Sequence, residues 1–183
     1  MLKQVYENAK VIKTGEHFTT VNEFTDQIPA LRPKVLWQAA LEINKIGTFN
    51  CNKILCEEDK GAPIGTAVSL ITGIPLAIAR WYPYMLPEEL SVPITCEYYK
   101  GNLYVNGIEE GDRITIVDDT ISTGGTIISM VEAIRKRNAH IEEIIAVVEK
   151  VNYNGVKRVK EMTGIDVKTI LKIQVENGAV KVI

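Results

Sequence analysis

The stretch Ile114-Thr115-Ile116-Val117-Asp118-Asp119-Thr120-Ile121-Ser122-Thr123-Gly124-Gly125-Thr126 decides the fold. Its apolar beginning, residues 114–118, predicts a buried strand, and residues 126–137 carry apolar side chains at helical spacing. Between them lies a short polar turn that ends in two glycines. A strand, a turn and a helix in this order predict a parallel α/β unit, with the turn at the carboxyl end of the strand.

The residues of this turn are suited to a phosphorylated sugar. Glycines allow close backbone approach, the start of a helix carries partial positive charge, and the hydroxyls of Ser122, Thr123 and Thr126 are further donors for a phosphate. The carboxylates of Asp118 and Asp119 can accept hydrogen bonds from the neighbouring hydroxyls of a ribose. The plainer alternative is that the two acids end a strand and the following residues only cap the helix. The residue types alone leave both interpretations open, although the turn has the donors and acceptors that a ribose 5-phosphate would need.

Strands and helices alternate through most of the chain. Predicted helices cover residues 33–45, 62–71, 126–137 and 155–163, and predicted strands cover 53–57, 75–79, 114–118, 141–148 and 167–175. Strands that alternate with helices require crossover connections, which favour parallel pairing. We therefore expect a Rossmann-like, mainly parallel α/β sheet with helices on both faces, formed by a single domain over residues 1–183.

Two segments depart from the alternation. Residues 80–106 are rich in aromatic residues and proline, and we expect a hairpin there, with strands at 94–98 and 103–105 around a turn at Lys100-Gly101-Asn102. A hairpin inserted into an α/β sheet is a candidate lid. Residues 1–32 mix polar and apolar residues without a clear period, and the pattern assigns them no elements.

Composition excludes several functional classes. The 183 residues carry a formal net charge of −2, so no basic field is available to hold a nucleic acid. Cys51, Cys56 and Cys96 lack CxxC spacing, and with only His17 and His140 the sequence forms no zinc-binding pattern. Nowhere does an uncharged apolar stretch approach the roughly 20 residues of a membrane span. We expect a cytoplasmic protein with small-molecule substrates and neither nucleic-acid nor membrane partners.

The motifs resemble those of type I phosphoribosyltransferases of the purine branch, which include adenine enzymes and archaeal-type hypoxanthine/guanine enzymes. Residues 114–126 match the family's phosphoribosyl pyrophosphate signature, and Glu58-Asp59-Lys60-Gly61-Ala62-Pro63-Ile64-Gly65 occupies the place of its pyrophosphate loop. Glu97-Tyr98 is similar to the Glu-Tyr of the flexible catalytic loop. The resemblance runs from about Phe18 to Ile173. It implies the family's fold, with a small N-terminal hood at about 1–32 and a flexible hairpin at about 80–106.

The resemblance also implies roles for individual residues. It suggests that the chemistry is carried by Asp118, Asp119, Glu97 and Tyr98. Ribose 5-phosphate would be bound by Thr120, Ile121, Ser122, Thr123, Gly124, Gly125 and Thr126. Pyrophosphate would be bound by Asp59, Lys60, Gly61 and Arg80, and the base by Glu149 and Lys150. The implied cofactor is Mg²⁺, held mainly by the substrate and reaching Asp118 and Asp119 through water.

Two departures from the family pattern leave the base open. Lys60 stands where adenine enzymes commonly have arginine and is reminiscent of orotate enzymes, and Trp81 stands where many relatives have a second basic residue. Trp81 could pack in the core or on a second subunit, or contact a ligand. The first expectation is a homodimeric enzyme of purine salvage that converts adenine and phosphoribosyl pyrophosphate to AMP and pyrophosphate. The alternative is a hypoxanthine/guanine enzyme, ahead of an orotate-type enzyme and a non-catalytic sensor of phosphoribosyl pyrophosphate.

Overall fold

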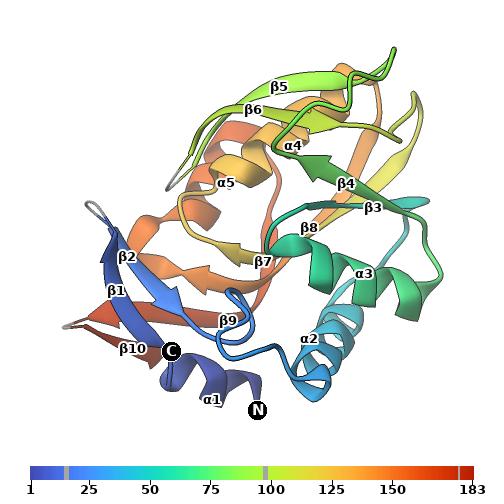
Figure 1. Cartoon of the computed structure of the whole chain (residues 1–183). Helices are drawn as coiled ribbons and strands as arrows, with labels where there is room; N and C mark the ends of the chain where they lie inside the picture. The colour runs from blue at the N-terminus through green and yellow to red at the C-terminus, as the bar shows by residue number, and fades with distance from the viewer. Residues whose placement is uncertain (15–16, 97–98, 177) are drawn as a thin grey trace.

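A computed structural model describes residues 1–14, 17–96, 99–176 and 178–183 (Figure 1). The α-helices are α1 (Leu2–Glu7), α2 (Pro33–Ile46), α3 (Gly61–Thr72), α4 (Gly125–Lys136) and α5 (Gly155–Thr163), and a short 3-10 helix, η1, covers Val151–Tyr153. The strands are β1 (Lys10–Thr14), β2 (His17–Val21), β3 (Lys53–Glu57), β4 (Leu76–Arg80), β5 (Leu90–Thr95), β6 (Lys100–Val105), β7 (Arg113–Ile121), β8 (His140–Lys150), β9 (Val167–Glu176) and β10 (Ala179–Val182).

An eight-stranded sheet forms the centre, with the order β10-β9-β8-β7-β3-β4-β6-β5. The five strands from β9 to β4 are parallel, and β10 and the β5–β6 hairpin add antiparallel edges. The mainly parallel α/β fold expected from the sequence is confirmed. From β3 the chain crosses to β4 through α3, whereas from β7 it crosses to β8 through α4 in the other direction. Such a reversal opens a crevice at the carboxyl ends of the two strands.

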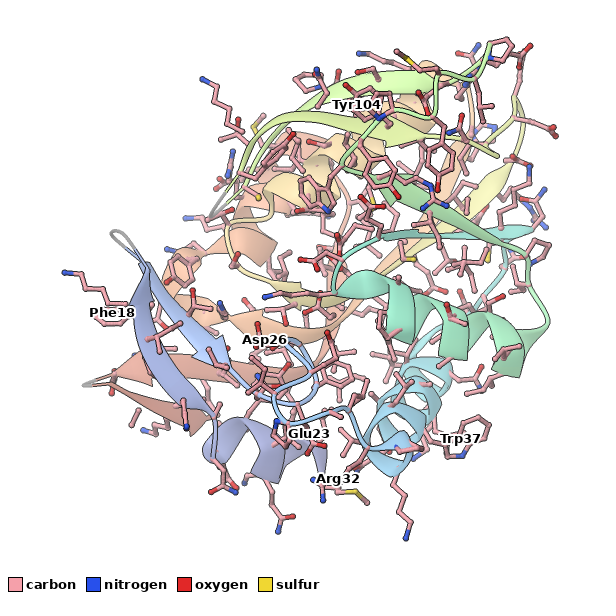
Figure 2. All side chains as sticks on the ribbon, viewed as in Figure 1. Phe18, Glu23, Asp26, Arg32, Trp37 and Tyr104 are labelled. Carbon is pink, nitrogen blue, oxygen red and sulfur yellow. The ribbon has the colours of Figure 1, made fainter. Side chains whose placement is uncertain are left out.

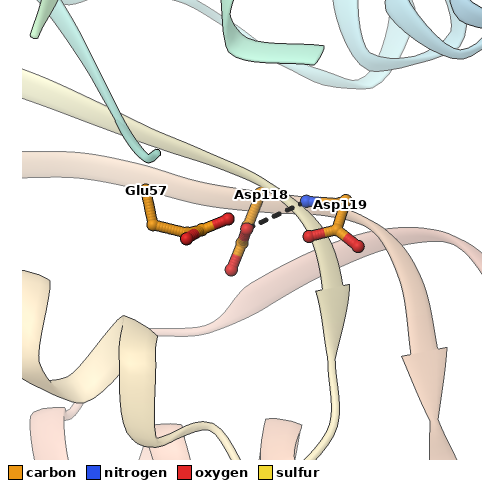
Figure 3. A group of neighbouring side chains, drawn as sticks. All are labelled: Glu57, Asp118 and Asp119. Carbon is orange, nitrogen blue, oxygen red and sulfur yellow. Dashed lines mark hydrogen bonds between the residues drawn. The ribbon is translucent and has the colours of Figure 1, made fainter. Parts of the chain in front are cut away.

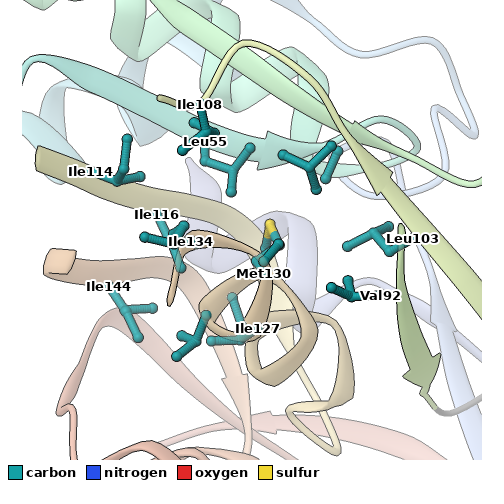
Figure 4. Close-up of a cluster of buried hydrophobic side chains, with 14 of the residues drawn as sticks. Leu55, Val92, Leu103, Ile108, Ile114, Ile116, Ile127, Met130, Ile134 and Ile144 are labelled. Carbon is teal, nitrogen blue, oxygen red and sulfur yellow. The ribbon is translucent and has the colours of Figure 1, made fainter. Parts of the chain in front are cut away.

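Apolar side chains cover both faces of the sheet. On one face, Ile127, Met130 and Ile134 of α4 join Ile116 and other strand residues in one buried cluster (Figure 4). On the opposite face, helices α1, α2 and α3 contribute to a second cluster that includes Val117. Neighbouring residues of β7 face different clusters, so the strand is buried on both faces from Ile114 to Asp119. This explains the strong strand signal in the sequence.

Local signals set most helix boundaries. Pro33 occupies the first turn of α2, and Gly73 and Gly164 follow α3 and α5 in the left-handed conformation that glycine adopts readily. These helices therefore begin and end within one or two residues of the predicted positions. Among the residues described, no helix has the length and apolar character required to span a membrane.

Two predicted boundaries are wrong. Strand β7 continues to Ile121, so Asp119 and Thr120 belong to the strand. Lys100-Gly101-Asn102 lies within β6, where Gly101 pairs with Ile94, so these three residues belong to a strand and not to the turn. The register follows from burial, since Val92 and Leu103 pair with each other and both face the first cluster.

The N-terminal residues form a unit at the edge of the crevice, with a helix and two strands that the sequence pattern did not assign. Helix α1 packs against β10, and β1 and β2 form a separate hairpin followed by a loop (Figure 1). The hydroxyl of Tyr153 accepts a hydrogen bond from the backbone N–H of Phe18 (3.0 Å) and donates to its carbonyl oxygen (3.2 Å). Figure 2 shows Phe18 on the hairpin and Asp26 on the loop. We call residues 1–32 the hood.

Candidate active site

A cavity lies where β7 ends, between the start of α4 and the hood. It is lined by the uninterrupted run 118–127, by Thr19, Thr20 and Thr25 of the hood, and by Glu57, Lys60, Cys96 and Lys150. The structure therefore brings together every residue that the sequence predicted for the ribose and its 5-phosphate. The hood threonines were missed, because nothing in their local pattern distinguishes them from other polar residues.

Two close backbone contacts hold the turn at residues 122–125. A Cβ atom on Gly125 would lie 1.9 Å from the carbonyl oxygen of Thr95, and one on Gly155 would lie 2.0 Å from that of Ser122. Gly124 has a positive φ of 77°. The turn is thus clamped between the hairpin and α5, at the N-terminus of a helix that favours anions. The Thr123 hydroxyl is buried and has no hydrogen-bond partner among the described residues, as expected of a donor for a phosphate.

Three carboxylates converge at the base of the cavity (Figure 3). Oxygen atoms of Glu57, Asp118 and Asp119 all lie within 4.8 Å of one another. The exposed fractions of these residues are 4%, 3% and 4%, so all three acids are buried. The start of α3 covers Asp118: a Cβ on Gly61 would lie 2.9 Å from Asp118 Oδ1.

Burial changes the acidity of all three groups. Burial, and then the charge of Asp119, raises the pKa of Asp118 well above its usual value. Burial also raises the pKa of Asp119, against the opposing effects of Thr120 and Lys60, and it raises that of Glu57. Holding three carboxylates together without a cation is unfavourable. The site therefore favours a bound cation or hydroxyl donors at these oxygens.

Glu57 was not predicted, and its main contacts are with the pyrophosphate loop. Its Oε1 accepts hydrogen bonds from the N–H groups of Lys60 (2.5 Å) and Gly61 (2.6 Å). Its Oε2 accepts from the N–H of Asp59 (2.9 Å) and from Trp81 Nε1 (3.1 Å). Four donors leave Glu57 little capacity for a metal. A glutamate just before a helix start was the available signal, since carboxylates accept from the first N–H groups of a helix.

Of the four residues predicted to bind pyrophosphate, only Lys60 lines the cavity. Its Nζ lies 2.8 Å from Oδ1 of Asp26 in the hood. Burial lowers the pKa of Lys60, but the contact with Asp26 and the charges of other nearby carboxylates outweigh burial, so the pKa is raised overall. Arg80 lies 3.6 Å from Glu58 and stacks on Tyr84, beside a separate depression. Asp59 and Gly61 shape the loop through their bonds to Glu57.

The two residues predicted to bind the base separate. Lys150 lines the cavity, 5.8 Å from the centre of the Tyr153 ring, whereas Glu149 forms an ion pair with Lys172 (3.2 Å). Neighbouring residues of a strand point in opposite directions, which explains the difference. Glu97 and Tyr98 lie outside the described residues. Cys96, directly before them, lines the cavity.

Asp118 and Asp119 are suited to Mg²⁺ held jointly with a substrate. The Oδ2 atom of Asp119 is buried and has no hydrogen-bond partner in the described part of the chain. Mg²⁺ prefers oxygen ligands and keeps several of its waters, so one or two carboxylates beside a polyphosphate suffice. These two acids therefore fit the cation.

A parallel sheet with an acid pair at the end of β7 and a glycine turn opening α4 defines an enzyme class that handles phosphorylated ribose. The phosphoribosyl transferase domain family matches residues 36–180, and the chain belongs to this family.

Named proteins agree with this membership. The chain is 40% identical over 183 residues to a hypoxanthine/guanine phosphoribosyltransferase from Methanothermococcus okinawensis, covering 100% of this chain and 99% of the relative. It is 40% identical over 184 residues to the enzyme of that name from Methanocaldococcus jannaschii, covering 100% of both. The crystal structure of adenine phosphoribosyltransferase from Thermoanaerobacter pseudethanolicus has a TM-score of 0.77 at 24% identity, covering 94% of this chain and 99% of that chain. The last similarity shows the fold.

Proposed function

We propose that this protein is a purine phosphoribosyltransferase that transfers ribose 5-phosphate to hypoxanthine or guanine, giving IMP or GMP and pyrophosphate. Full-length relatives at 40% identity carry the hypoxanthine/guanine name, which supports these bases over adenine, the first expectation from the sequence. The adenine enzyme of T. pseudethanolicus shares only 24% identity with the chain.

The observation that carries the proposal is the position of Lys150 in the cavity. A lysine ammonium group is a hydrogen-bond donor and never an acceptor. Hypoxanthine and guanine carry an acceptor oxygen at position 6, whereas adenine carries an amino donor there. A hydrogen bond from a charged donor contributes about 1.5–3 kcal/mol, so donation from Lys150 to this oxygen would favour a 6-oxopurine by roughly tenfold or more.

The remaining cavity residues divide the other half of the substrate between them. Asp118 and Asp119 accept hydrogen bonds from the ribose hydroxyls, the turn at 122–126 binds the 5-phosphate, and Lys60 binds the diphosphate. Mg²⁺ neutralises the charge of the diphosphate when bound. The bond from C1′ to the diphosphate oxygen breaks, and its electron pair leaves with pyrophosphate. A ring nitrogen of the base forms the new bond to C1′ and loses its proton to solvent, while the protein contributes orientation and charge.

Pyrophosphate release tests the proposal directly. Hypoxanthine, guanine, adenine, xanthine and orotate are offered separately with phosphoribosyl pyrophosphate and Mg²⁺. We expect turnover with the first two and at least tenfold lower kcat/KM with adenine. A preference for adenine or orotate would refute the assignment of the base. Binding of phosphoribosyl pyrophosphate without turnover of any base would instead indicate a sensor.

The role of Lys150 is tested by Lys150→Met. We expect kcat/KM for hypoxanthine to fall about 10- to 100-fold, the loss of one charged hydrogen bond, with little change in KM for phosphoribosyl pyrophosphate. Lys172→Met is the matched control, since Lys172 lies on the neighbouring strand and pairs with Glu149 outside the cavity. Equal effects of both substitutions would show that Lys150 does not bind the base.

The proposal includes Mg²⁺ dependence and a homodimer in the cytoplasm. Chelation of divalent cations should abolish turnover, and addition of Mg²⁺ should restore it. Sedimentation equilibrium should give twice the mass of the 20.4 kDa chain.

A further inference from the structure

Tyr6 of α1 belongs to the second apolar cluster and does not line the cavity. Its exposed fraction is 0%, and its ring packs 6.5 Å from that of Phe24. Its hydroxyl is buried and forms no hydrogen bond with the described residues. Since buried polar groups in proteins nearly always have partners, an unpaired phenol beside an active site requires an explanation.

The groups that face this hydroxyl belong to the ribose-binding strand and to the hood. Burial, followed by the charge of Asp119, holds the pKa of Tyr6 well above its usual value. The side chain of Thr120 acts in the opposite direction, and Asp26 adds a smaller effect of the same sign as Asp119. The phenol therefore keeps its proton at neutral pH and can only act there as a neutral donor or acceptor.

Two residues that affect the pKa of Tyr6 also carry unpaired atoms. The hydroxyl oxygen of Thr120 and the Oδ2 atom of Asp119 are both buried, and neither has a hydrogen-bond partner within the described part of the chain. Two hydroxyl groups and one carboxylate oxygen can form a short chain of hydrogen bonds, which we call the relay, because each hydroxyl can donate to the next oxygen.

Helix α1 provides a fixed base for this relay. The backbone N–H of Leu2 donates to Oε1 of Gln38 on α2 (3.0 Å), and α1 packs against β10. Leu2, Val5 and Tyr6 all belong to the second apolar cluster. The hydroxyl of Tyr6 is therefore held at a defined place behind β7.

We propose that Tyr6 is a positioning residue for the ribose-binding acid, donating its hydroxyl hydrogen to Thr120, which in turn donates to Asp119. The relay fixes one oxygen of the Asp119 carboxylate and leaves the other for a ribose hydroxyl. This inference rests on the proposed use of phosphoribosyl pyrophosphate but is independent of which base is used.

Tyr6→Phe tests the proposal, because it removes the hydroxyl and keeps the ring against Phe24. We expect KM for phosphoribosyl pyrophosphate to rise roughly tenfold, the effect of one hydrogen bond, with KM for hypoxanthine and the melting temperature unchanged. Tyr104→Phe is the matched control, since Tyr104 lies on β6 and does not line the cavity (Figure 2). It should leave both KM values unchanged.

A second variant separates positioning from packing. Thr120→Val should produce a similar rise in KM, and the double variant Tyr6→Phe/Thr120→Val should be no worse than the single ones, because both interrupt one relay. Additive effects, an unchanged KM for phosphoribosyl pyrophosphate, or parallel losses in both KM values and in melting temperature would overturn the proposal. If the wild type itself neither binds nor turns over phosphoribosyl pyrophosphate, the proposed function fails first.

Discussion

Replacing Gly155 with alanine tests whether α5 sets the position of the ribose-phosphate turn. Gly155 is the first residue of α5 and does not line the cavity. The Cβ of an alanine there would lie 2.0 Å from the carbonyl oxygen of Ser122, 2.8 Å from its carbonyl carbon and 3.0 Å from the backbone nitrogen of Gly124. All three atoms are backbone, so no side chain can rotate away.

The size of the effect follows from this overlap. Real Cβ contacts are essentially never shorter than 3.0 Å, so α5 and the turn must separate by about 1 Å. A displacement of about 1 Å from a productive geometry can cost on the order of 100-fold in rate. We therefore expect kcat/KM for phosphoribosyl pyrophosphate to fall about 100-fold, together with about 1–3 kcal/mol of unfolding free energy from overpacking.

Steady-state kinetics and urea unfolding of Gly155→Ala measure both quantities. Gly164→Ala, at the other end of α5, is the control: Gly164 has a positive φ of 78°, but no heavy atom lies within 4 Å of the added Cβ. It should lose about 1 kcal/mol of stability and retain activity. A folded Gly155→Ala protein with kcat/KM within about threefold of wild type would refute the clamp by α5, since 1.36 kcal/mol corresponds to tenfold.

Three further predictions follow from the charged groups. Asp118→Asn should abolish turnover and raise the melting temperature. The pKa of Asp118 is raised in the folded state, so its ionisation at neutral pH opposes folding. An unchanged or lower melting temperature would contradict this. Glu143→Gln should destabilise the protein by about 1–3 kcal/mol at pH 7, because burial is outweighed by the bonds from Lys168, Phe49 and Thr48 and the pKa of Glu143 is lowered. That contribution is present above the ordinary glutamate pKa of about 4.3 and is lost as the pH falls through the lower pKa of the folded state. The unfolding free energies of wild type and variant should therefore converge in acid. A difference that persists at low pH would refute the assignment. Lys60→Met should raise KM for phosphoribosyl pyrophosphate about tenfold or more, whereas a neutral effect would mean that Lys60 does not bind the diphosphate.

The central strands and the ribose-phosphate turn could be predicted because their signals are local. Strand β7 is apolar on both faces, and Gly73 and Gly164 mark helix ends by their own conformational preference. The acid pair and the glycine turn are contiguous in sequence, so their meeting in one cavity required no knowledge of tertiary contacts.

Elements at the edge of the fold could not be found this way. Strand β10 alternates exposed and half-buried residues over only four positions. Helix α1 has only six residues, and its burial depends on β10 and α2. Arg80 lies outside the cavity, where it contacts Glu58 and the ring of Tyr84. The burial of Asp118 depends on the close approach of Gly61. Each of these facts is set by partners distant in sequence.

The carboxylate of Glu57 has a consequence for inhibitor design. This carboxylate already accepts hydrogen bonds from the N–H groups of residues 59–61. A ligand group aimed at those donors must therefore displace a buried anion that is bound by four hydrogen bonds. A second phosphate mimic pointed at this backbone would therefore add little affinity. Selective compounds should instead carry their negative charge toward the turn at 122–126 and the ammonium group of Lys60, and reach Lys150 with a hydrogen-bond acceptor.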